Sequence, residues 1–208
     1  PGPEQAAAGA LAQHAPCAQP LTLPRQLRRH ALQQQTDSAP DDAVLGVIGV
    51  ASEETPDVTL LGTTAGLVFK DLTETIAHYY DEILGQADAL VVVAHMGTDD
   101  SGPYEGLATV AQELIDAGKP VDLMIGGHQH QALSTPLYVG DTAIVSAGYY
   151  GRYLGQVDVS IDTASGGLSV DNYTLHTIGT ALAAEPGVEA RVAYWADVVA
   201  PIVNQPVG

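Results

Sequence analysis

Residues Val121 to Gln131 read VDLMIGGHQHQ, and they contain the most informative pattern of the chain. An apolar run, 123–125, is followed by two glycines and then by two histidines with one residue between them. A second apolar run upstream, at residues 87–97, reads ADALVVVAHMG and also ends near a histidine, His95. Short apolar runs bounded by turn residues are typical of buried strands. Two strands that each place an imidazole at the carboxyl end predict a metal site at the rim of a sheet.

The segments around these runs alternate between strand and helix patterns. Residues 44–51, VLGVIGVA, form a continuous apolar run, which predicts a strand buried on both faces. Apolar residues recur at helical spacing in residues 71–84 and in about 104–117, and Gly118 ends the second helix. This alternation predicts an α/β fold with parallel strands joined by right-handed crossovers. Ligands of such open sheets bind beyond the carboxyl ends of the strands, where the histidines lie.

After Gln131 the pattern changes from alternating elements to hairpins and a final helix. Strands are predicted at residues 137–139, 142–147, 153–161 and 168–177, with turns rich in glycine between them. A last amphipathic helix is predicted over residues 188–199. Residues 1–43 differ from the rest because they are rich in Ala, Pro and Gln and develop no long apolar face. We interpret residues 1–43 as an atypical, poorly ordered lead-in and residues 44–208 as the folded part.

The composition bounds the class of protein. A chain of 208 residues with 46% hydrophobic residues and a mean hydropathy of +0.09 can form one globular domain. The formal net charge of -18 argues against a nucleic-acid partner, because an acidic surface repels phosphate backbones. No apolar run approaches the ~18 residues of a membrane span, and residues 1–20 show no signal-peptide pattern. Cys17 is the only cysteine, which excludes an internal disulfide and a zinc site of several thiolates.

Three histidines are candidate metal ligands: His95, His128 and His130. His128 and His130 can face one site if their segment stays extended, because residues two apart in a strand point to the same side. A single histidine of this kind is more often a core or loop residue, but three at strand ends favour a metal site. Asp99 and Asp100 follow His95 in the next loop and can orient a ligand histidine. Capping of the following helix is the competing interpretation of these two aspartates.

Aromatic and basic residues near 150 have a structural and a functional interpretation. Arg152 can contact a phosphate group, but its place in a predicted sheet turn favours a structural role. Tyr149, Tyr150 and Tyr153 are predicted to pack in the hairpin sheet rather than to form a platform for stacked bases.

The ordered motifs carry a resemblance to a known family. The runs AHMG at 94–97 and IGGHQH at 125–130 resemble the later half of the calcineurin-like metallophosphoesterases. The resemblance is strongest to the branch of 5′-nucleotidases and 2′,3′-cyclic-nucleotide phosphodiesterases. Further motifs agree with that branch in order: VIGV at 47–50, ETP at 54–56, the segment 67–71, and AGYYGRYLG at 147–155. The resemblance covers about residues 44–208 and implies a partial four-layer αββα sandwich, the C-terminal half of the catalytic domain.

The same resemblance implies a centre of two divalent metal ions, of the Zn, Mn or Fe type. His95 and His128 are then ligands of one metal and His130 of the other. The first half of the family pattern, an Asp-x-His pair and a GNH[DE] motif, has no counterpart in residues 1–94. We therefore identify no catalytic residue in the chain. Metal binding is expected to be weak, since a catalytic zinc normally keeps three protein ligands.

The activity implied is metal-dependent hydrolysis of a phosphate ester, such as a nucleotide, in the periplasm or outside the cell. We expect a partial catalytic domain that is impaired alone. Its expected partners are the missing N-terminal half and a C-terminal substrate-binding domain. One alternative is a non-catalytic, degenerate domain that acts as a surface or interaction module. Another is a site of one metal bound by histidines, with unrelated chemistry.

Overall fold

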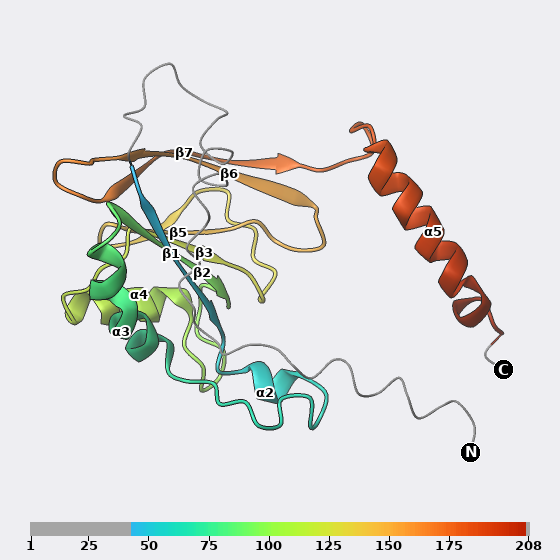
Figure 1. The fold of residues 1–208 in the computed structure, drawn as a ribbon, viewed down its shortest axis with the longest axis horizontal. Helices are drawn as coiled ribbons and strands as arrows, with labels where there is room; N and C mark the ends of the chain where they lie inside the picture. Colours follow the sequence, from blue (N-terminus) through green and yellow to red (C-terminus); the bar gives the residue numbers. More distant parts are fainter. Residues whose placement is uncertain (1–42, 207–208) are drawn as a thin grey trace. The chain divides into compact units, whose positions relative to one another are not determined.

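A computed structural model describes residues 43–206 of the chain (Figure 1). The lead-in predicted at residues 1–43 lies outside the described residues, apart from Ala43. The chain divides into two compact units, whose described parts are residues 43–176 and 177–206. The first unit contains the predicted strand ends and their histidines.

The first unit alternates strands and helices before it turns to hairpins, as predicted. Its elements are β1 (Leu45–Ala51), α2 (Thr55–Val58), α3 (Leu72–Leu84), β2 (Ala89–His95), α4 (Leu107–Asp116), β3 (Leu123–Gly126), β4 (Leu137–Val139), β5 (Thr142–Ser146), β6 (Tyr153–Ile161) and β7 (Leu168–Thr177). The second unit contains α5 (Pro186–Val203), which is longer at both ends than the predicted helix. Helix α4 begins later than predicted, because Ser101 and Tyr104 pair as an isolated bridge and Gly106 is extended.

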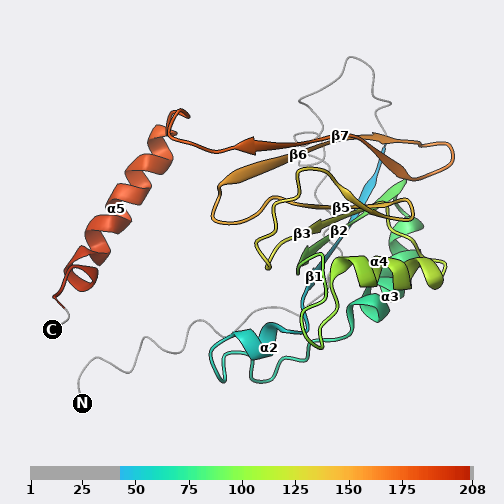
Figure 2. The same cartoon turned by 180° about the vertical axis from the view of Figure 1, so that it is seen from behind.

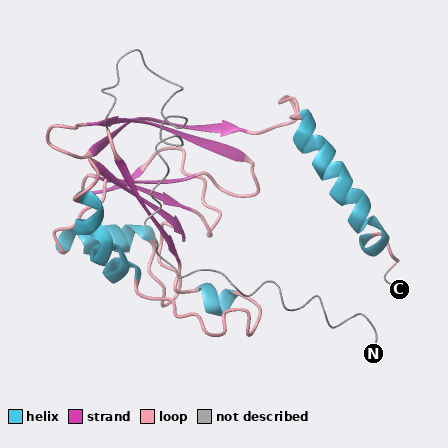
Figure 3. Cartoon of the chain, in the orientation of Figure 1, coloured by secondary structure: helices cyan, strands magenta, loops and turns pink. Residues whose placement is uncertain are grey.

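Five strands form the main sheet, in the order β1-β2-β3-β5-β4. Strands β1, β2, β3 and β5 are parallel, and β4 at the edge is antiparallel to β5. The prediction of parallel strands in the first half of the fold is therefore confirmed. Figure 3 shows the separate ribbon of β6 and β7, which form a two-stranded sheet.

Helices α3 and α4 cover one face of the main sheet, and the two opposite views agree on this (Figures 1 and 2). The core between them includes Ile76 and Leu107, both fully buried, with Leu90 and Met124 from the strands. Burial of each such side chain stabilises the fold by about 1.5–3 kcal/mol. Asp71 caps the N-terminus of helix α3, because its carboxylate accepts a hydrogen bond from the backbone N–H of Glu74.

The strand pair β6–β7 packs on the opposite face of the main sheet. The contact joins Val91, Leu123, Ala143 and Val145 to Val157, Leu168, Val170 and Tyr173. The carboxylate of Asp122 fixes this arrangement, because it accepts hydrogen bonds from the backbone N–H of Leu90 in β2 and of Leu168 in β7. The described unit thus has the layers α–β–β, and the predicted α/β fold with a parallel sheet and flanking helices is confirmed.

Strand β1 is not buried on both faces, and that prediction is wrong. Ile48 faces the helices and is 5% exposed, whereas Leu45 on the other face is 44% exposed. Val93 of β2 is also exposed on that face. The reason is that β6–β7 cover the middle of the sheet, while β1 pairs only with β2 among the described residues.

Between residues 43 and 206, no helix is long and apolar enough to cross a membrane.

Candidate metal centre

The carboxyl ends of the parallel strands bring the predicted residues to one rim of the sheet. His95 is the last residue of β2 and lies beside Ala51, the last residue of β1. His128 comes two residues after β3, which pairs with β2 in parallel. The loop that follows β5 begins at the same edge, because β5 is parallel to β3. This convergence was the basis of the sequence prediction, and the topology confirms it.

The segment after β3 does not stay extended. His128 and His130 have φ angles of 61° and 60°, in the left-handed region that few residues other than glycine adopt. Gly126, two residues before His128, is tightly packed. A Cβ atom on Gly126 would lie 2.8 Å from the Leu107 side chain and 3.1 Å from the carbonyl oxygen of Met96. Because the extended geometry fails, His128 and His130 have different neighbours.

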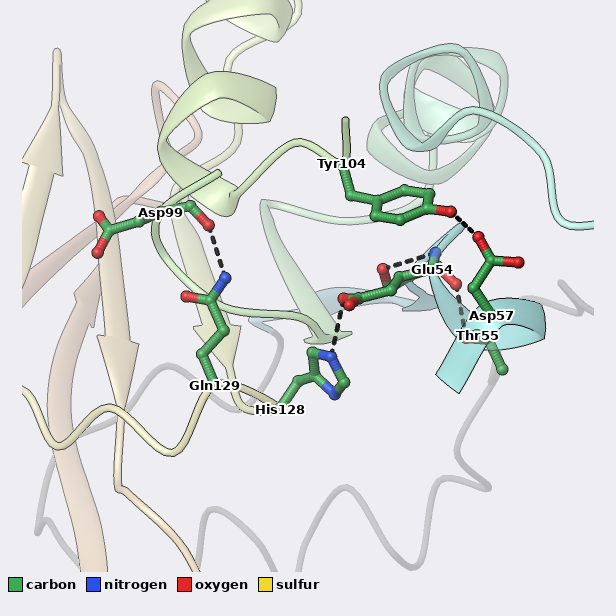
Figure 4. A network of polar contacts seen from close by, with 8 residues as sticks. Glu54, Thr55, Asp57, Asp99, Tyr104, His128 and Gln129 are labelled. Carbon is green, nitrogen blue, oxygen red and sulfur yellow. Dashed lines mark hydrogen bonds and ion pairs between the residues drawn. The ribbon is translucent and has the colours of Figure 1, made fainter. Parts of the chain in front are cut away.

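His95 and His128 lie side by side. Their ring centroids are 5.1 Å apart, and the ring planes make an angle of 63°. The Nε2 atom of His128 lies 2.9 Å from Oε2 of Glu54, in the segment that follows β1 (Figure 4). The side chains of His128 and Glu54 are only 24% and 17% exposed, so this contact is shielded from bulk water. Two imidazoles and one carboxylate therefore gather at the ends of β1, β2 and β3.

His130 lies in a different environment, against aromatic rings. Its ring stacks on Tyr149 with a centroid distance of 4.6 Å and an angle of 21°, and it meets the edge of Tyr150 at 5.5 Å. Tyr149 and Tyr150 lie in the loop between β5 and β6, outside the predicted strands, and both contact His130. The structure thus pairs two of the three candidate histidines and places the third with the loop after β5.

Glutamine side chains join the loops that carry the histidines. Gln131 accepts hydrogen bonds from the backbone N–H and the hydroxyl of Thr98, and it donates one to Asp99. Gln129 donates to the backbone carbonyl of Asp99, on the side away from His128 (Figure 4). The alternating His-Gln-His-Gln sequence at 128–131 therefore gives two glutamines that fasten the loop after β3 to the loop after β2.

Asp99 and Asp100 hold the loop and the next helix. Asp100 Oδ1 accepts hydrogen bonds from the backbone N–H of Gly106 and the hydroxyl of Thr109, at the start of α4. Asp99 is bound by Gln131. Within residues 43–206 neither carboxylate hydrogen-bonds to a histidine. Asp100 bonds at the start of the next helix, whereas Asp99 binds the loop that carries the histidines. Orientation of a metal-ligating histidine by either residue remains a prediction.

The hydrogen bonds of Asp100 at the start of α4 give a pH-dependent stability that can be tested. The two hydrogen bonds, from Gly106 first and Thr109 second, lower the pKa of Asp100. A carboxylate with a lowered folded-state pKa stabilises the fold above its unfolded pKa of about 3.9, and this stabilisation is lost as pH falls through the folded-state pKa. We expect Asp100→Asn to lower the melting temperature at pH 7. The difference from wild type should shrink as the pH falls below the unfolded pKa of about 3.9.

Thermal unfolding followed by circular dichroism from pH 7 to pH 3 measures this difference. Asp116→Asn is the control, since it removes the same charge at the other end of α4, where Asp116 accepts from Gln112. A difference between wild type and Asp100→Asn that stays constant down to pH 3 would contradict the expected linkage.

The described residues fit a complete metal centre poorly. In residues 43–206, no three or more His, Cys, Asp or Glu side chains are arranged so that they could hold one metal ion. The pair of imidazoles with Glu54 is a partial donor set. The donor chemistry at this rim suits a divalent metal, but at least one further ligand is needed.

Glu54 is the residue of this rim that the sequence predictions missed as a site residue. It follows the end of β1 in the ETP element, at the same edge as His95. The rule that the carboxyl ends of parallel strands meet at one rim was enough to include it. The prediction applied that rule only to the histidines.

Comparison with known proteins gives partial matches. No protein-family model matches the chain. The cell wall protein Lmo0130 of Listeria monocytogenes is 33% identical over 139 residues, which are 61% of this chain and 17% of that protein. The uncharacterized metallophosphoesterase YunD of Bacillus subtilis is 28% identical over 119 residues, 57% of this chain and 23% of that protein. The chain thus spans about a fifth of the length of these relatives.

The fold comparison agrees with the sequence comparison. A crystal structure of a 5′-nucleotidase precursor from Thermus thermophilus superposes with a TM-score of 0.60 and 19% identity. The superposition covers 77% of this chain and 33% of that one, and at this identity the likeness shows the fold. The homologues and structural neighbours of this chain are therefore calcineurin-like metallophosphoesterases and 5′-nucleotidases, of which it matches a part.

Proposed function

We propose that this chain is part of a metal-dependent phosphoric-ester hydrolase of the 5′-nucleotidase type, which acts on a nucleotide or another phosphate ester. The observation that carries this proposal is the pair His95 and His128 at the carboxyl ends of adjacent parallel strands. The pair lies in a fold shared with the metallophosphoesterases, which use divalent metal ions. In this proposal His95 and His128 bind one metal and His130 binds the other.

We further propose that the chain is impaired by itself. The donor set at the rim is incomplete in the described residues. The exposed face of the sheet at its β1 edge, with Leu45 of β1 and Val93 of β2, also suits coverage by additional protein. The proposed additions are an N-terminal half that carries the missing ligands and a C-terminal domain that binds the substrate. A location in the periplasm or outside the cell is part of this proposal, and the name of the cell wall protein supports it.

A second function is favoured by the same incomplete donor set. In that alternative the chain is a degenerate domain without catalysis, which acts as a surface or interaction module. The DNA immediately upstream distinguishes the two functions. A reading frame there that encodes Asp-x-His and GNH[DE] motifs favours a part of an enzyme, whereas a complete frame without them favours the module.

Turnover by the purified 208-residue chain tests the proposal directly. We expect no more than slow hydrolysis of a nucleoside monophosphate with added Zn²⁺ or Mn²⁺, lost in His95→Ala and His128→Ala. His176→Ala is the matched control, because this histidine lies in β7 and hydrogen-bonds to Gln156 of β6. Robust turnover by the chain alone would show that it is a complete enzyme. Slow turnover that survives both substitutions at the rim would contradict the assignment of the site.

A further inference from the structure

Three side chains form a stacked column beside the candidate metal centre. The guanidinium carbon of Arg152 lies 4.5 Å from the centre of the Tyr149 ring. The same ring stacks on His130 at 4.6 Å. Tyr150 completes the cluster, with its ring steeply inclined to both other rings, and this residue is 85% exposed. The loop after β5 thus carries an aromatic and cationic surface up to the third candidate histidine.

Backbone contacts hold this loop in place against the segment of His130. The backbone N–H of Gly148 donates to the carbonyl of Gln131 at 2.9 Å, and Ser146 Oγ donates to the same carbonyl at 2.7 Å. Ala132 and Ala147 pair as an isolated bridge. The column is therefore built on a loop joined to the histidine segment, and its geometry does not depend on side-chain stacking alone.

The guanidinium of Arg152 is available to a ligand. Within the described part of the chain it has no carboxylate within ion-pair distance, unlike Lys119, which pairs with Asp81 at 2.7 Å. In the described residues its side-chain N–H donors make no hydrogen bond, so they can bind a ligand while the guanidinium carbon lies over the Tyr149 ring. This fork of donors matches the oxygens of phosphate better than an ammonium group does.

The charge of the whole chain makes this cation notable. With a formal net charge of -18, the molecule as a whole repels anions. A phosphate ester that approaches the rim needs local positive charge, and Arg152 is placed there by the loop after β5. The structural role first favoured for Arg152 does not account for a guanidinium held on an aromatic ring without an anionic partner in the described residues.

We propose that Arg152 binds the phosphoryl group of the ligand at this rim, and that Tyr149 is its positioning residue. The proposal deepens the proposed function and rests on it for the class of ligand. It adds a contact supplied by this chain's own side chains, independent of any metal ion. The ligand chemistry is a phosphoryl oxygen anion, whether it belongs to free phosphate or to a phosphate ester.

A titration of the metal-free chain with inorganic phosphate, at constant ionic strength, tests the contact. Two-dimensional NMR of the backbone and arginine N–H groups gives the dissociation constant. Arg152→Ala is expected to weaken binding about tenfold or more, because hydrogen bonds to charged groups are among the strongest. Arg191→Ala is the control, as it removes the same charge from α5 in the other unit. Equal phosphate affinity for wild type and Arg152→Ala would overturn the proposal. An equal loss of affinity in Arg152→Ala and Arg191→Ala would also overturn it.

Variants of the ring separate positioning from direct contact. Tyr149→Phe keeps the stacked ring and is expected to bind phosphate like wild type. Tyr149→Leu removes the ring and is expected to weaken phosphate binding by severalfold. The chemical shifts of the Arg152 N–H resonances should then move toward those of an unstacked arginine. A Tyr149→Phe variant as weak as Tyr149→Leu would overturn the positioning role, since the hydroxyl is not part of the stack. The dispersion of the backbone spectrum shows that each variant is folded.

Three ligands distinguish the source of the phosphoryl group and separate this proposal from the previous one. Phosphate and adenosine monophosphate should both lose affinity in Arg152→Ala, and adenosine should be unaffected. A loss for adenosine as well would overturn recognition of the phosphoryl group. If phosphate binding depends on Arg152 but no ester is hydrolysed with added metal in any assembly, the hydrolase function fails while this binding site stands.

Discussion

Gly106→Ala is expected to lower the free energy of unfolding by about 3 kcal/mol, at the upper end of the usual cost of overpacking. A Cβ atom on Gly106 would lie 2.3 Å from the carbonyl carbon of Asp99, and 2.5 Å from the carbonyl oxygens of Asp99 and Thr98. These are backbone atoms, so no side-chain rotation can relieve the overlap. The start of α4 must therefore move away from the loop after β2.

The effect of Gly106→Ala reaches the candidate site through the glutamine contacts. Gln131 binds both Thr98 and Asp99, and Gln129 binds the carbonyl of Asp99. A shift of this loop changes the positions of His128 and His130, which lie in the same segment as the glutamines. We therefore expect the imidazole NMR resonances of these histidines to move in the variant, even where the fold survives.

Urea unfolding of wild type and of two glycine variants measures the change in the free energy of unfolding. Gly49→Ala is the matched control, because Gly49 lies in strand β1 and no atom lies within 4 Å of the position that its new Cβ would take. Its stability should remain within about 0.5 kcal/mol of wild type. If Gly106→Ala were as stable as Gly49→Ala, the close approach of α4 to the loop after β2 would be wrong.

The strands and helices could be predicted because their signals are local. The apolar runs at 44–51 and 89–95, and the helical spacing at 71–84, depend on neighbouring residues alone. The order of these elements then determined parallel pairing, since a strand–helix–strand unit has one favoured handedness. The rim that carries His95 and His128 followed from that order.

The pairing of later strands could not be predicted in the same way. Strands β4 and β5 form a hairpin as expected, but β5 also joins the main sheet in parallel beside β3. This choice depends on which surfaces remain to be covered after the first strands have paired. The exposed face of β1 could not be predicted for the same reason. Its apolar run depends on local composition alone and does not show which elements will cover the strand.

The geometry of the site escaped prediction for a backbone reason. The rule for side chains two apart holds only in an extended strand, and the left-handed conformation of His128 and His130 breaks it. Nothing in the letters HQH requires this conformation. It arises where Gly126 packs tightly against α4 and the two glutamines bind the neighbouring loop.

The second large effect is expected on zinc binding by the isolated chain. His95→Ala and His128→Ala should each weaken binding by more than about 100-fold, to the limit of detection, since loss of even an indirect ligand partner costs 10–100-fold. His130→Ala should change the affinity for the first zinc ion little, because its ring stacks on Tyr149 while the other two rings adjoin each other. The wild-type affinity is itself expected to be weak, with two imidazoles in the donor set.

Isothermal titration calorimetry with zinc at pH 7.5 distinguishes the possible donor sets, with His176→Ala as the control for removal of an imidazole. Glu54→Gln is expected to weaken binding by about tenfold, because the carboxylate next to His128 Nε2 then no longer carries a charge toward the metal. Equal losses for all three rim histidines would mean that His130 leaves Tyr149 to join one shared site. Zinc binding unchanged in both His95→Ala and His128→Ala would instead remove the paired imidazoles as the basis of the proposed centre.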